Sequence, residues 1–374
     1  MTLFVDCRML NSSGIGRYIQ DTLIGLCSLD QDLRFILGGD PVEIHSFLNS
    51  NSLVSKHLID IISFRSPIYS IEEQCYGGIL LNSLKKSADL FHFPHYNVPL
   101  FFSGHFVVTV HDLVHMLFPE YFGTARAKMA SIILKRSLVN AKRIIAVSQA
   151  TAMDIKKTFP DVAHKVCIVY EYPSEFFNPQ PIFDITSFKE KNNLSHYILY
   201  VGNRKPHKNI KRLIMAFQLL NHQFPNLQLV IVGKKFTAND EVSILLKSLQ
   251  NNDIIELDEC DDEELRFFYC GAEALILPSL YEGFGLTALE AMACGTPVVV
   301  SDVASLPEIV GTAGLYFNPY NTENMAEMIH EILSNKILHD ELRAAGLARV
   351  KLFTREISAR KTFEVYQKAL TDMR

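Results

Sequence analysis

Short runs of branched apolar residues alternate along the whole chain with longer stretches in which apolar positions recur at helical spacing. The short runs are almost uninterrupted by polar residues, as expected for strands of a parallel sheet that is covered by helices on both faces. This repeated alternation of strand and helix predicts a doubly wound α/β protein. The expected strands are residues 2–7, 34–39, 106–112, 143–148, 165–170, 197–203, 227–233, 253–257, 273–279, 297–302 and 314–318.

A break in this pattern falls at residues 172–184, "YPSEFFNPQPIFD", where three prolines interrupt regular structure. The second half then restarts with a fresh strand. We therefore predict an N-terminal Rossmann-like domain over 1–175, a linker over 176–190 and a C-terminal Rossmann-like domain over 191–355. The last segment, 356–374, has helical apolar spacing and could pack back on the first domain. Two similar α/β halves favour a ligand site in a cleft between them.

Composition narrows the class of protein. The 374 residues are 48% hydrophobic and 21% charged, and the net charge of -5 argues against general nucleic-acid binding. No apolar run approaches about 20 residues, so no membrane span is expected. The start "MTLFVDCRML" lacks the layout of a secretory signal. Seven scattered cysteines without a C-x-x-C pair favour reduced thiols in the cytoplasm.

The stretch 280–302, "LYEGFGLTALEAMACGTPVVVSD", joins an expected strand to an expected helix through a glycine-containing turn. The turn follows the carboxyl end of a parallel strand, where such folds bind ligands. Gly285 allows close backbone approach, and a helix that begins near Leu286 directs its positive end at an anion such as phosphate. Glu290, about one turn into the helix, suits a ribose diol, whereas Glu282 can reach another part of the ligand. Alternatively, the two glutamates are a solvated loop acid and a helix-dipole acid.

A basic turn occurs earlier, in "YVGNRKPHKNIKRLIMAF" (200–217), between an expected strand and an expected helix. Arg204, Lys205, His207 and Lys208 crowd this turn, and like charges that lie close together cost energy unless they face a shared anion. A departing nucleoside diphosphate is such an anion, because its developing charge needs fixed cations. The alternative is a solvated basic loop.

In the first half, "NSSGIGRYIQDTL" (11–23) follows the first strand and opens a helix. Gly14 and Gly16 suggest a phosphate-binding turn, but Ile19 stands where a dinucleotide fingerprint has its third glycine. A tight strand-to-helix turn is the alternative. The incomplete fingerprint disfavours a dinucleotide-dependent oxidoreductase.

Histidines gather near the ends of the first-half strands. His111 ends the strand in "FVVTVHDL", and His92 and His95 lie in "FHFPHYNVPL". Tyr96 and Asn97 follow, and these four residues (His92, His95, Tyr96 and Asn97) are candidate contacts to an acceptor substrate. A histidine cluster also suggests a metal, but no carboxylates share the spacing and no D-x-D is present, so we expect no metal. The alternative for His111 is a buried core histidine.

The stretch "EGFGLTALEAMACGTPVVVS" resembles the retaining nucleotide-sugar glycosyltransferases of family 4, which have the GT-B fold of two Rossmann-like domains. Their hallmark is a pair of glutamates separated by seven residues, as Glu282 and Glu290 are. The resemblance implies that Glu290 holds the ribose and that Glu282 faces the donor sugar at the reacting centre. It further assigns the donor diphosphate to the main chain of Phe284, Gly285 and Leu286. Thr287 stands where the family often has proline.

The same resemblance covers other motifs. Lys208 matches the family's lysine for the diphosphate. The usual arginine position is occupied by Asn203, so that Arg204 comes one place late as the second ligand. The start "DCRML…SGIGRY" resembles the acceptor domain of family 4 members that often transfer mannose, in which the glycine loop (Gly14 and Gly16 here) faces the donor. The histidine of "HDL", His111, is implied to contact the donor sugar.

These features predict a cytoplasmic, retaining glycosyltransferase that needs no metal or cofactor. It would move a hexose from a nucleoside diphosphate, with guanine and mannose as the first guess, to a glycan or lipid-linked acceptor. Alternatives are a nucleotide-sugar epimerase of the same fold and a non-catalytic nucleotide-sugar-binding protein. Residues 125–143 carry basic side chains and no acid, which indicates either a solvated helix face or contact with anionic lipid at the inner membrane face.

Overall fold

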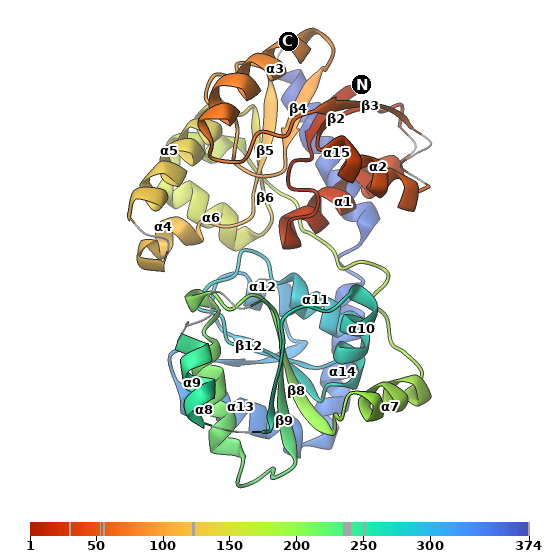
Figure 1. The fold of residues 1–374 in the computed structure, drawn as a ribbon, viewed down its shortest axis with the longest axis vertical. Helices are drawn as coiled ribbons and strands as arrows, with labels where there is room; N and C mark the ends of the chain where they lie inside the picture. The colour runs from red at the N-terminus through yellow and green to blue at the C-terminus, as the bar shows by residue number, and fades with distance from the viewer. Residues whose placement is uncertain are drawn as a thin grey trace. The chain divides into compact units, whose positions relative to one another are not determined.

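The computed structural model describes residues 1–29, 31–52, 54, 57–121, 124–234, 241–249 and 252–372, without the side chains of 13 and 124–127. The chain forms two compact units. The N-terminal unit contains Met1–Glu171 together with the segment from Thr354 onward. The C-terminal unit contains Tyr172–Phe353. Each unit is built around its own parallel sheet (Figure 1).

Within the described residues, the N-terminal unit has a seven-stranded sheet in the order β3-β2-β1-β4-β5-β6-β7, and every neighbouring pair is parallel. The strand order reverses direction between β1 and β4. The strands are β1 (Thr2–Asp6), β2 (Arg34–Gly39), β3 (Leu58–Ser63), β4 (Leu90–Phe93), β5 (Phe106–Val110), β6 (Arg143–Ala146) and β7 (Val166–Ile168). The helices are α1 (Ser13–Cys27), α2 (Pro41–Ser50), η2 (Glu73–Gly77), α3 (Gly78–Ser83), η3 (Leu84–Lys86), α4 (Val114–Leu117), η4 (Pro119–Tyr121), α5 (Thr124–Asn140), α6 (Gln149–Thr158), η5 (Pro160–Lys165) and α15 (Arg355–Thr371).

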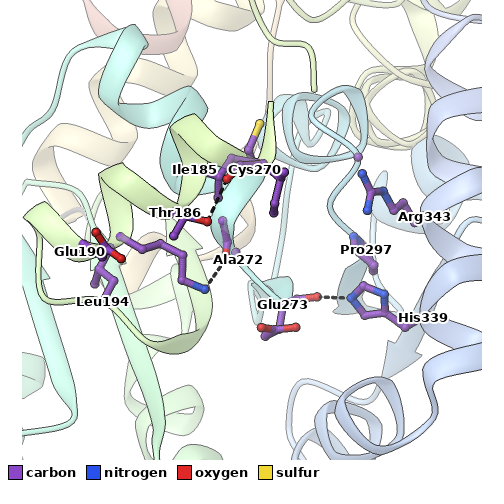
Figure 2. A pocket seen from close by; sticks show the side chains of 14 residues that line it. Ile185, Thr186, Glu190, Leu194, Cys270, Ala272, Glu273, Pro297, His339 and Arg343 are labelled. Atoms are coloured by element: carbon purple, nitrogen blue, oxygen red, sulfur yellow. Dashed lines mark hydrogen bonds between the residues drawn. The ribbon is translucent and has the colours of Figure 1, made fainter. Parts of the chain in front are cut away.

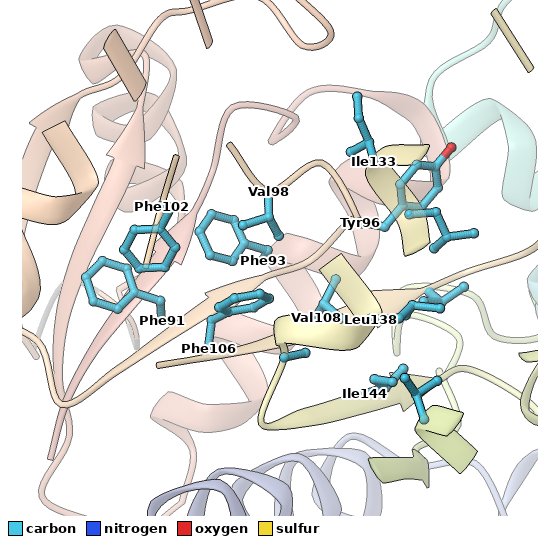
Figure 3. Close-up of a cluster of buried hydrophobic side chains, with 14 of the residues drawn as sticks. Phe91, Phe93, Tyr96, Val98, Phe102, Phe106, Val108, Ile133, Leu138 and Ile144 are labelled. Carbon is cyan, nitrogen blue, oxygen red and sulfur yellow. The ribbon is translucent and has the colours of Figure 1, made fainter. Parts of the chain in front are cut away.

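Alternate side chains of these strands point to opposite faces of the sheet, and each face has its own core. One core contains Phe91, Phe93 and Phe106, packed beneath α5 and α6 (Figure 3). The ring centroids of Phe93 and Phe106 lie 5.5 Å apart at 90°, an edge-to-face contact. The other core joins the opposite face to α1, α2 and α15. Continuous apolar strands are therefore required, because both faces are covered.

The C-terminal helix α15 belongs to the N-terminal unit and packs on α1, β5 and β6. Val365, Tyr366 and Ala369 are its buried contacts with the sheet. The Tyr366 hydroxyl lies 2.8 Å from Nδ1 of His92 on β4, a buried hydrogen bond between residues 274 positions apart. The second half of α15 thus helps to cover the same sheet face as α1.

Within the described residues, the C-terminal unit has a six-stranded parallel sheet in the order β10-β9-β8-β11-β12-β13, which reverses between β8 and β11. The strands are β8 (His196–Val201), β9 (Leu227–Val232), β10 (Ile254–Leu257), β11 (Ala274–Leu277), β12 (Val298–Ser301) and β13 (Gly314–Phe317). The helices are α7 (Ile182–Lys191), η6 (Pro206–Lys208), α8 (Ile210–Leu220), α9 (Glu241–Leu249), α10 (Asp262–Gly271), α11 (Leu286–Ala293), α12 (Leu306–Val310), α13 (Thr322–Ser334) and α14 (Lys336–Val350).

Three features differ from the sequence prediction. The stretch expected as a linker, 176–190, contains most of α7, which packs against α10 of the C-terminal unit. Pro181 precedes this helix rather than interrupting it, as proline is tolerated at a helix start. The strands β3 and β4 were absent from the expected set. β3 is an edge strand without a fully buried residue, and β4 is only four residues long, so neither has a strong apolar signature.

Candidate active site

The carboxyl edge of the C-terminal sheet brings two loops together. β8 and β11 are neighbouring strands, so the loops that follow them start side by side at this edge. The strand order reverses between the two strands, so the chain continues from these loops to opposite faces of the sheet. In open α/β sheets this switch point is where ligands bind. The loop after β8 contains Lys208, and the loop after β11 contains Glu282 and Gly285. Two motifs that lie 74 residues apart in sequence therefore meet.

Lys208 and Glu282 form an ion pair at this switch point. The Lys208 ammonium donates to Oε1 of Glu282 at 2.8 Å and to Oε2 at 2.9 Å. The Ser279 hydroxyl also donates to Oε1, at 2.6 Å. Burial disfavours the charged carboxylate, but Lys208 and Ser279 outweigh it and lower the pKa of Glu282. An ammonium has three N–H groups, so two contacts to Glu282 leave one for an incoming anion.

The glycine turn positions the start of α11. Gly285 precedes the helix with φ 103°, a left-handed conformation that favours glycine. A Cβ at Gly285 would lie 2.9 Å from a methyl of Leu306. The Ser305 hydroxyl donates to the carbonyls of Glu282 (2.9 Å) and Phe284 (2.7 Å), which fixes the turn. The helix start, at Leu286, offers main-chain N–H groups and a positive dipole end at the switch point.

Glu290 lies within α11 and is 2% exposed. Its Oε2 accepts a hydrogen bond of 2.8 Å from the hydroxyl of Tyr269 on α10. Tyr269 is itself held by Thr296, whose hydroxyl donates to the Tyr269 carbonyl at 2.5 Å. The helix position expected for the ribose-binding glutamate thus carries a carboxylate that is oriented by a buried tyrosine.

Arg204 does not face Lys208 in this structure. Residues 202–204 continue to pair with the end of β9, through Gly202 N–H to Val232 and Arg204 N–H to Lys234. The guanidinium is buried and forms an ion pair with Glu256 on β10. A diphosphate role for Arg204 would require this buried pair to open. Asn203, by contrast, is exposed, and its carbonyl accepts a hydrogen bond of 2.9 Å from the Tyr200 hydroxyl.

His111 lies directly after β5 in the N-terminal unit, at the carboxyl edge of that sheet. Its Nδ1 is 3.1 Å from Oε1 of Glu171, and its Nε2 is 2.8 Å from the carbonyl oxygen of Pro94. The ring of Tyr18 packs edge-on at 4.8 Å. His111 is therefore neither an isolated core residue nor a freely rotating side chain.

The four predicted acceptor residues cluster at the end of β4, but they differ in accessibility. His92 is fully buried, and its two ring nitrogens contact Thr109 (2.9 Å) and Tyr366 (2.8 Å), so this structure does not present it to an acceptor. Burial lowers the pKa of His92 to about 3. Tyr96 is also buried, stacked between the rings of His95 and His115, and Asn97 is 2% exposed. His95 is the half-buried member of the group.

Gly14 and Gly16 lie in the first turn of α1, directly after the β1 loop. A Cβ on Gly16 would lie 2.5 Å from the carbonyl oxygen of Leu10, so this glycine is required for the turn itself. A Cβ on Gly14 would meet nothing within 4 Å. Gly14 is exposed and has space around it, which is the property a ligand-facing glycine needs.

Several site residues were missed by sequence reasoning because they lie outside the motifs. Ser279, Ser305 and Tyr269 orient the motif groups through hydrogen bonds made only in the folded chain. In the N-terminal unit, Arg8 pairs with Asp6 and Glu73, both at 2.7 Å. The fragment "DCRML" could have indicated this network, because Asp6 and Arg8 lie two residues apart at the end of a strand and are therefore close enough to pair.

A second hollow of about 390 Å³ lies at the opposite, amino edge of the C-terminal sheet. It is lined by α7, the end of α10 and α14, with Glu190 on one side and Arg343 on the other (Figure 2). There the Nε2–H of His339 donates a hydrogen bond of 3.0 Å to the carbonyl oxygen of Glu273. Because parallel sheets bind ligands at their carboxyl edge, this hollow is not the donor site.

Among the described residues, no group of three or more His, Cys, Asp or Glu side chains is arranged to hold a metal ion. Within the same part of the chain, no helix combines the length and apolar character needed to cross a membrane.

The chain is similar to known glycosyltransferases. A family model described as "Glycosyl transferases group 1" matches residues 183–349. O-antigen chain mannosyltransferase B of Escherichia coli is 32% identical over 283 residues, which cover 73% of this chain and 74% of the relative. O-antigen chain mannosyltransferase RfbU of Salmonella typhimurium is 29% identical over 238 residues, covering 64% and 63%.

Solved structures share the fold. Anabaena Alr3699/HepE, in complex with UDP and glucose, superposes with a TM-score of 0.78 at 18% identity, over 98% of this chain and 99% of that chain. WaaG, a glycosyltransferase involved in lipopolysaccharide biosynthesis, has a TM-score of 0.71 at 16% identity, over 98% of each chain.

The two Rossmann-like parallel sheets, one in each unit, together with the likeness to these solved structures, show that the chain has the GT-B fold. With the match to the family model and to the E. coli relative, the chain belongs to the group 1 glycosyltransferase family.

Proposed function

We propose that this glycosyltransferase moves a hexose, with mannose as the first candidate, from a nucleoside diphosphate to a hydroxyl of a glycan or lipid-linked glycan. Two relatives named as mannosyltransferases support the choice of sugar, and guanine is the first candidate base. The observation that carries the proposal is the contact between Lys208 and Glu282 beside the α11 start. This contact places the Lys208 ammonium, which can bind phosphate, beside the Glu282 carboxylate, which can stabilise positive charge on the sugar carbon.

In this proposal the donor diphosphate lies against the main-chain N–H groups of Gly285 and Leu286. It also accepts a hydrogen bond from the N–H of Lys208 that does not contact Glu282. Asn203 and the main chain of Phe284 complete this side of the donor. Glu290 holds the ribose, oriented by Tyr269. Arg204 contributes only if it leaves Glu256, so Lys208 and the helix dipole supply most of the positive charge. No divalent metal or cofactor is required.

The proposed chemistry is substitution with retention at the anomeric carbon. The bond from the acceptor oxygen to C1 forms on the face from which the C1–O–phosphate bond breaks, and the departing phosphate takes the acceptor proton. Positive charge grows on C1 in the transition state, and the Glu282 carboxylate stabilises it. The lowered pKa of Glu282 favours this charged form. The family resemblance implies further donor contacts in the N-terminal unit, namely His111 after β5 and Gly14 and Gly16 in the first turn of α1.

We further propose that residues 125–143 contact an anionic membrane surface, where a lipid-linked acceptor would be found, on the cytoplasmic side. On α5, Lys128, Lys135 and Arg136 are exposed together with Met129 and Ile132, which are 53% and 59% exposed. Cations interspersed with exposed apolar side chains suit headgroup binding with shallow insertion. The side chain of Arg126 lies outside the described residues.

Co-sedimentation with anionic and with zwitterionic vesicles tests the proposed membrane contact. The double variant Lys135→Glu/Arg136→Glu is expected to reduce binding to anionic vesicles only.

The deciding experiment incubates the full chain with a panel of nucleoside diphosphate sugars and a mannose-containing acceptor, with and without EDTA. We expect nucleoside diphosphate release that depends on acceptor and persists in EDTA, with an anomeric proton coupling in the product that matches the donor configuration. Release of nucleotide with an epimerised free sugar and no acceptor requirement would support the epimerase instead. Binding of donor without any turnover would point to a non-catalytic binding protein.

A further inference from the structure

The contacts of His111 specify its protonation state. The ring lies between two oxygen atoms, the Glu171 carboxylate at 3.1 Å from Nδ1 and the Pro94 carbonyl at 2.8 Å from Nε2. A carbonyl accepts hydrogen bonds only, and so does an ionised carboxylate. Both ring nitrogens must therefore carry a hydrogen, and only the imidazolium satisfies both contacts. A neutral ring would set a lone pair against an oxygen on one side.

The surrounding groups favour the same state. The side chains of His111 and Glu171 are 16% and 12% exposed, so solvent weakly screens their attraction. Burial opposes the charged ring, but Glu171, the Pro94 carbonyl and Asp112 outweigh it and raise the pKa of His111. Burial and the positive charge of His111 lower the pKa of His92 and of His95, each to about 3.

The elements packed around His111 bring few other titratable groups to it. Tyr18 comes from α1, with its ring edge-on to the imidazole and its hydroxyl bonded to Thr109 at 2.9 Å. His92 and His95 come from β4 and its loop, Asp112 follows His111 on the loop after β5, and Glu171 follows β7. With both neighbouring histidines neutral, His111 carries the positive charge of this three-histidine group.

We propose that Glu171 is a positioning residue that holds His111 as a permanent imidazolium, so that His111 serves sugar transfer as a fixed cation and not as a general base. This rests on the proposed function and deepens it. A general base needs a free lone pair on a ring nitrogen, and neither nitrogen of His111 has one here. A cation at the carboxyl edge of the sheet suits the negative charge that develops on the departing diphosphate.

The first test follows the His111 ring by NMR as pH is varied, in the wild type, Glu171→Gln and Glu171→Asp, without any substrate. We expect ring deprotonation in the wild type at a pH above that of an ordinary histidine. Glu171→Gln should lower that pH by about one unit or more, because an adjacent opposite charge is removed. Glu171→Asp, which keeps the charge, should retain part of the effect even if its shorter side chain weakens the contact. A ring that titrates identically in all three overturns the proposal.

The second test measures kcat/KM for the donor against pH. If His111 acts as a cation, activity falls as pH rises through the His111 transition, and Glu171→Gln moves that fall to lower pH while activity is recovered in more acidic buffer. A merely structural role for Glu171 would lower activity at every pH. Activity that instead rises through the His111 transition identifies a base and overturns the proposal. Glu120→Gln, at an exposed acid of the same unit, is the control and should match the wild type.

The two tests separate two failures. Absence of turnover with every nucleotide sugar refutes the proposed function, yet the ring titration still decides whether Glu171 holds His111 protonated. Turnover with an unchanged ring titration refutes the role of Glu171 and leaves the transferase proposal standing.

Discussion

In the N-terminal unit the strand order reverses between β1 and β4, and in the C-terminal unit it reverses between β8 and β11. The two switch points are topologically equivalent but chemically different. The C-terminal one joins Lys208 to Glu282 beside a left-handed glycine. The N-terminal one gathers histidines, aromatic rings and the buried Asp6–Arg8–Glu73 network. The C-terminal switch point places one ion pair beside a helix start, whereas the N-terminal switch point pairs its polar side chains in a larger buried network.

This difference shows how one topology supports two tasks. Loops after parallel strands are brought together whatever their sequence, so the fold supplies a location and the loop residues supply the chemistry. A phosphate-bearing donor needs main-chain N–H groups and a cation. The glycine turn and the helix start provide the N–H groups, and Lys208 provides the cation. The buried polar network of the N-terminal unit instead fixes loop positions.

The largest effect is expected from Glu282→Gln in the C-terminal unit. Removing the charge while keeping the shape should lower kcat by about 100-fold or more, because the carboxylate stabilises a charge that exists only in the transition state. Donor binding, measured by calorimetry with a nucleoside diphosphate, should change little. Glu263→Gln, at an exposed acid of α10, serves as the control, and equal turnover in both variants would remove Glu282 from the mechanism.

The Lys208–Glu282 pair can be tested by a double-mutant cycle. Lys208→Met leaves the Glu282 carboxylate largely buried without its ammonium partner, and should cost about 3 kcal/mol of unfolding free energy. Lys208→Met/Glu282→Gln should recover part of this loss, since no uncompensated charge remains. Urea denaturation measures both. Additive losses would show that the two side chains do not stabilise one another.

Gly14 and Gly16 offer a matched pair in the N-terminal unit. Gly16→Ala places a Cβ 2.5 Å from the Leu10 carbonyl oxygen and should destabilise this unit by about 2 kcal/mol, because backbone must shift. Gly14→Ala meets open space and should keep or slightly raise stability, as alanine favours a helix. If Gly14→Ala nevertheless raises the donor KM, the ligand approaches that position. Equal stability of the two variants would contradict the packing argument.

The effect of pH on the free energy of unfolding is the smallest when it is counted per pH unit. His92 has its pKa lowered by burial to about 3, so the unfolded chain binds the proton more readily at acidic pH. Stability should therefore fall as pH drops below about 6.5, by up to about 1.4 kcal/mol per pH unit for this group. His92→Gln should reduce that slope, whereas His164→Gln, at an exposed position, should not. Identical slopes would exclude His92 as a source of acid sensitivity.

Glu282 and His111 add two further dependences of known sign. The pKa of Glu282 is lowered, so its contribution is present above about pH 4.5 and is lost as pH falls through the folded value. The pKa of His111 is raised, so its contribution is present below about pH 6.5 and is lost as pH rises through the folded value. Denaturation curves between about pH 2.5 and pH 9, in the wild type and in variants that lack Glu282 or His111, separate these contributions.

The sequence by itself determined the α/β class and most of the strands, because continuous apolar runs must be covered on both faces. It also supplied the candidate residues of the C-terminal site, since Lys208 and the Glu282–Glu290 pair each lie within one continuous motif, and the roles predicted for them are those that the family resemblance implies. The last helix was recognisable from its apolar spacing, although the face it covers was not.

Only the tertiary structure decided which polar groups pair. Arg204 reads as a phosphate ligand in sequence but is buried against Glu256, 52 residues away. His92 and His111 look alike in sequence, yet one is neutral between Thr109 and Tyr366 and the other is held by Glu171. Charge and hydrogen-bond state depend on partners brought together by chain topology and on burial, and neither is encoded in local spacing.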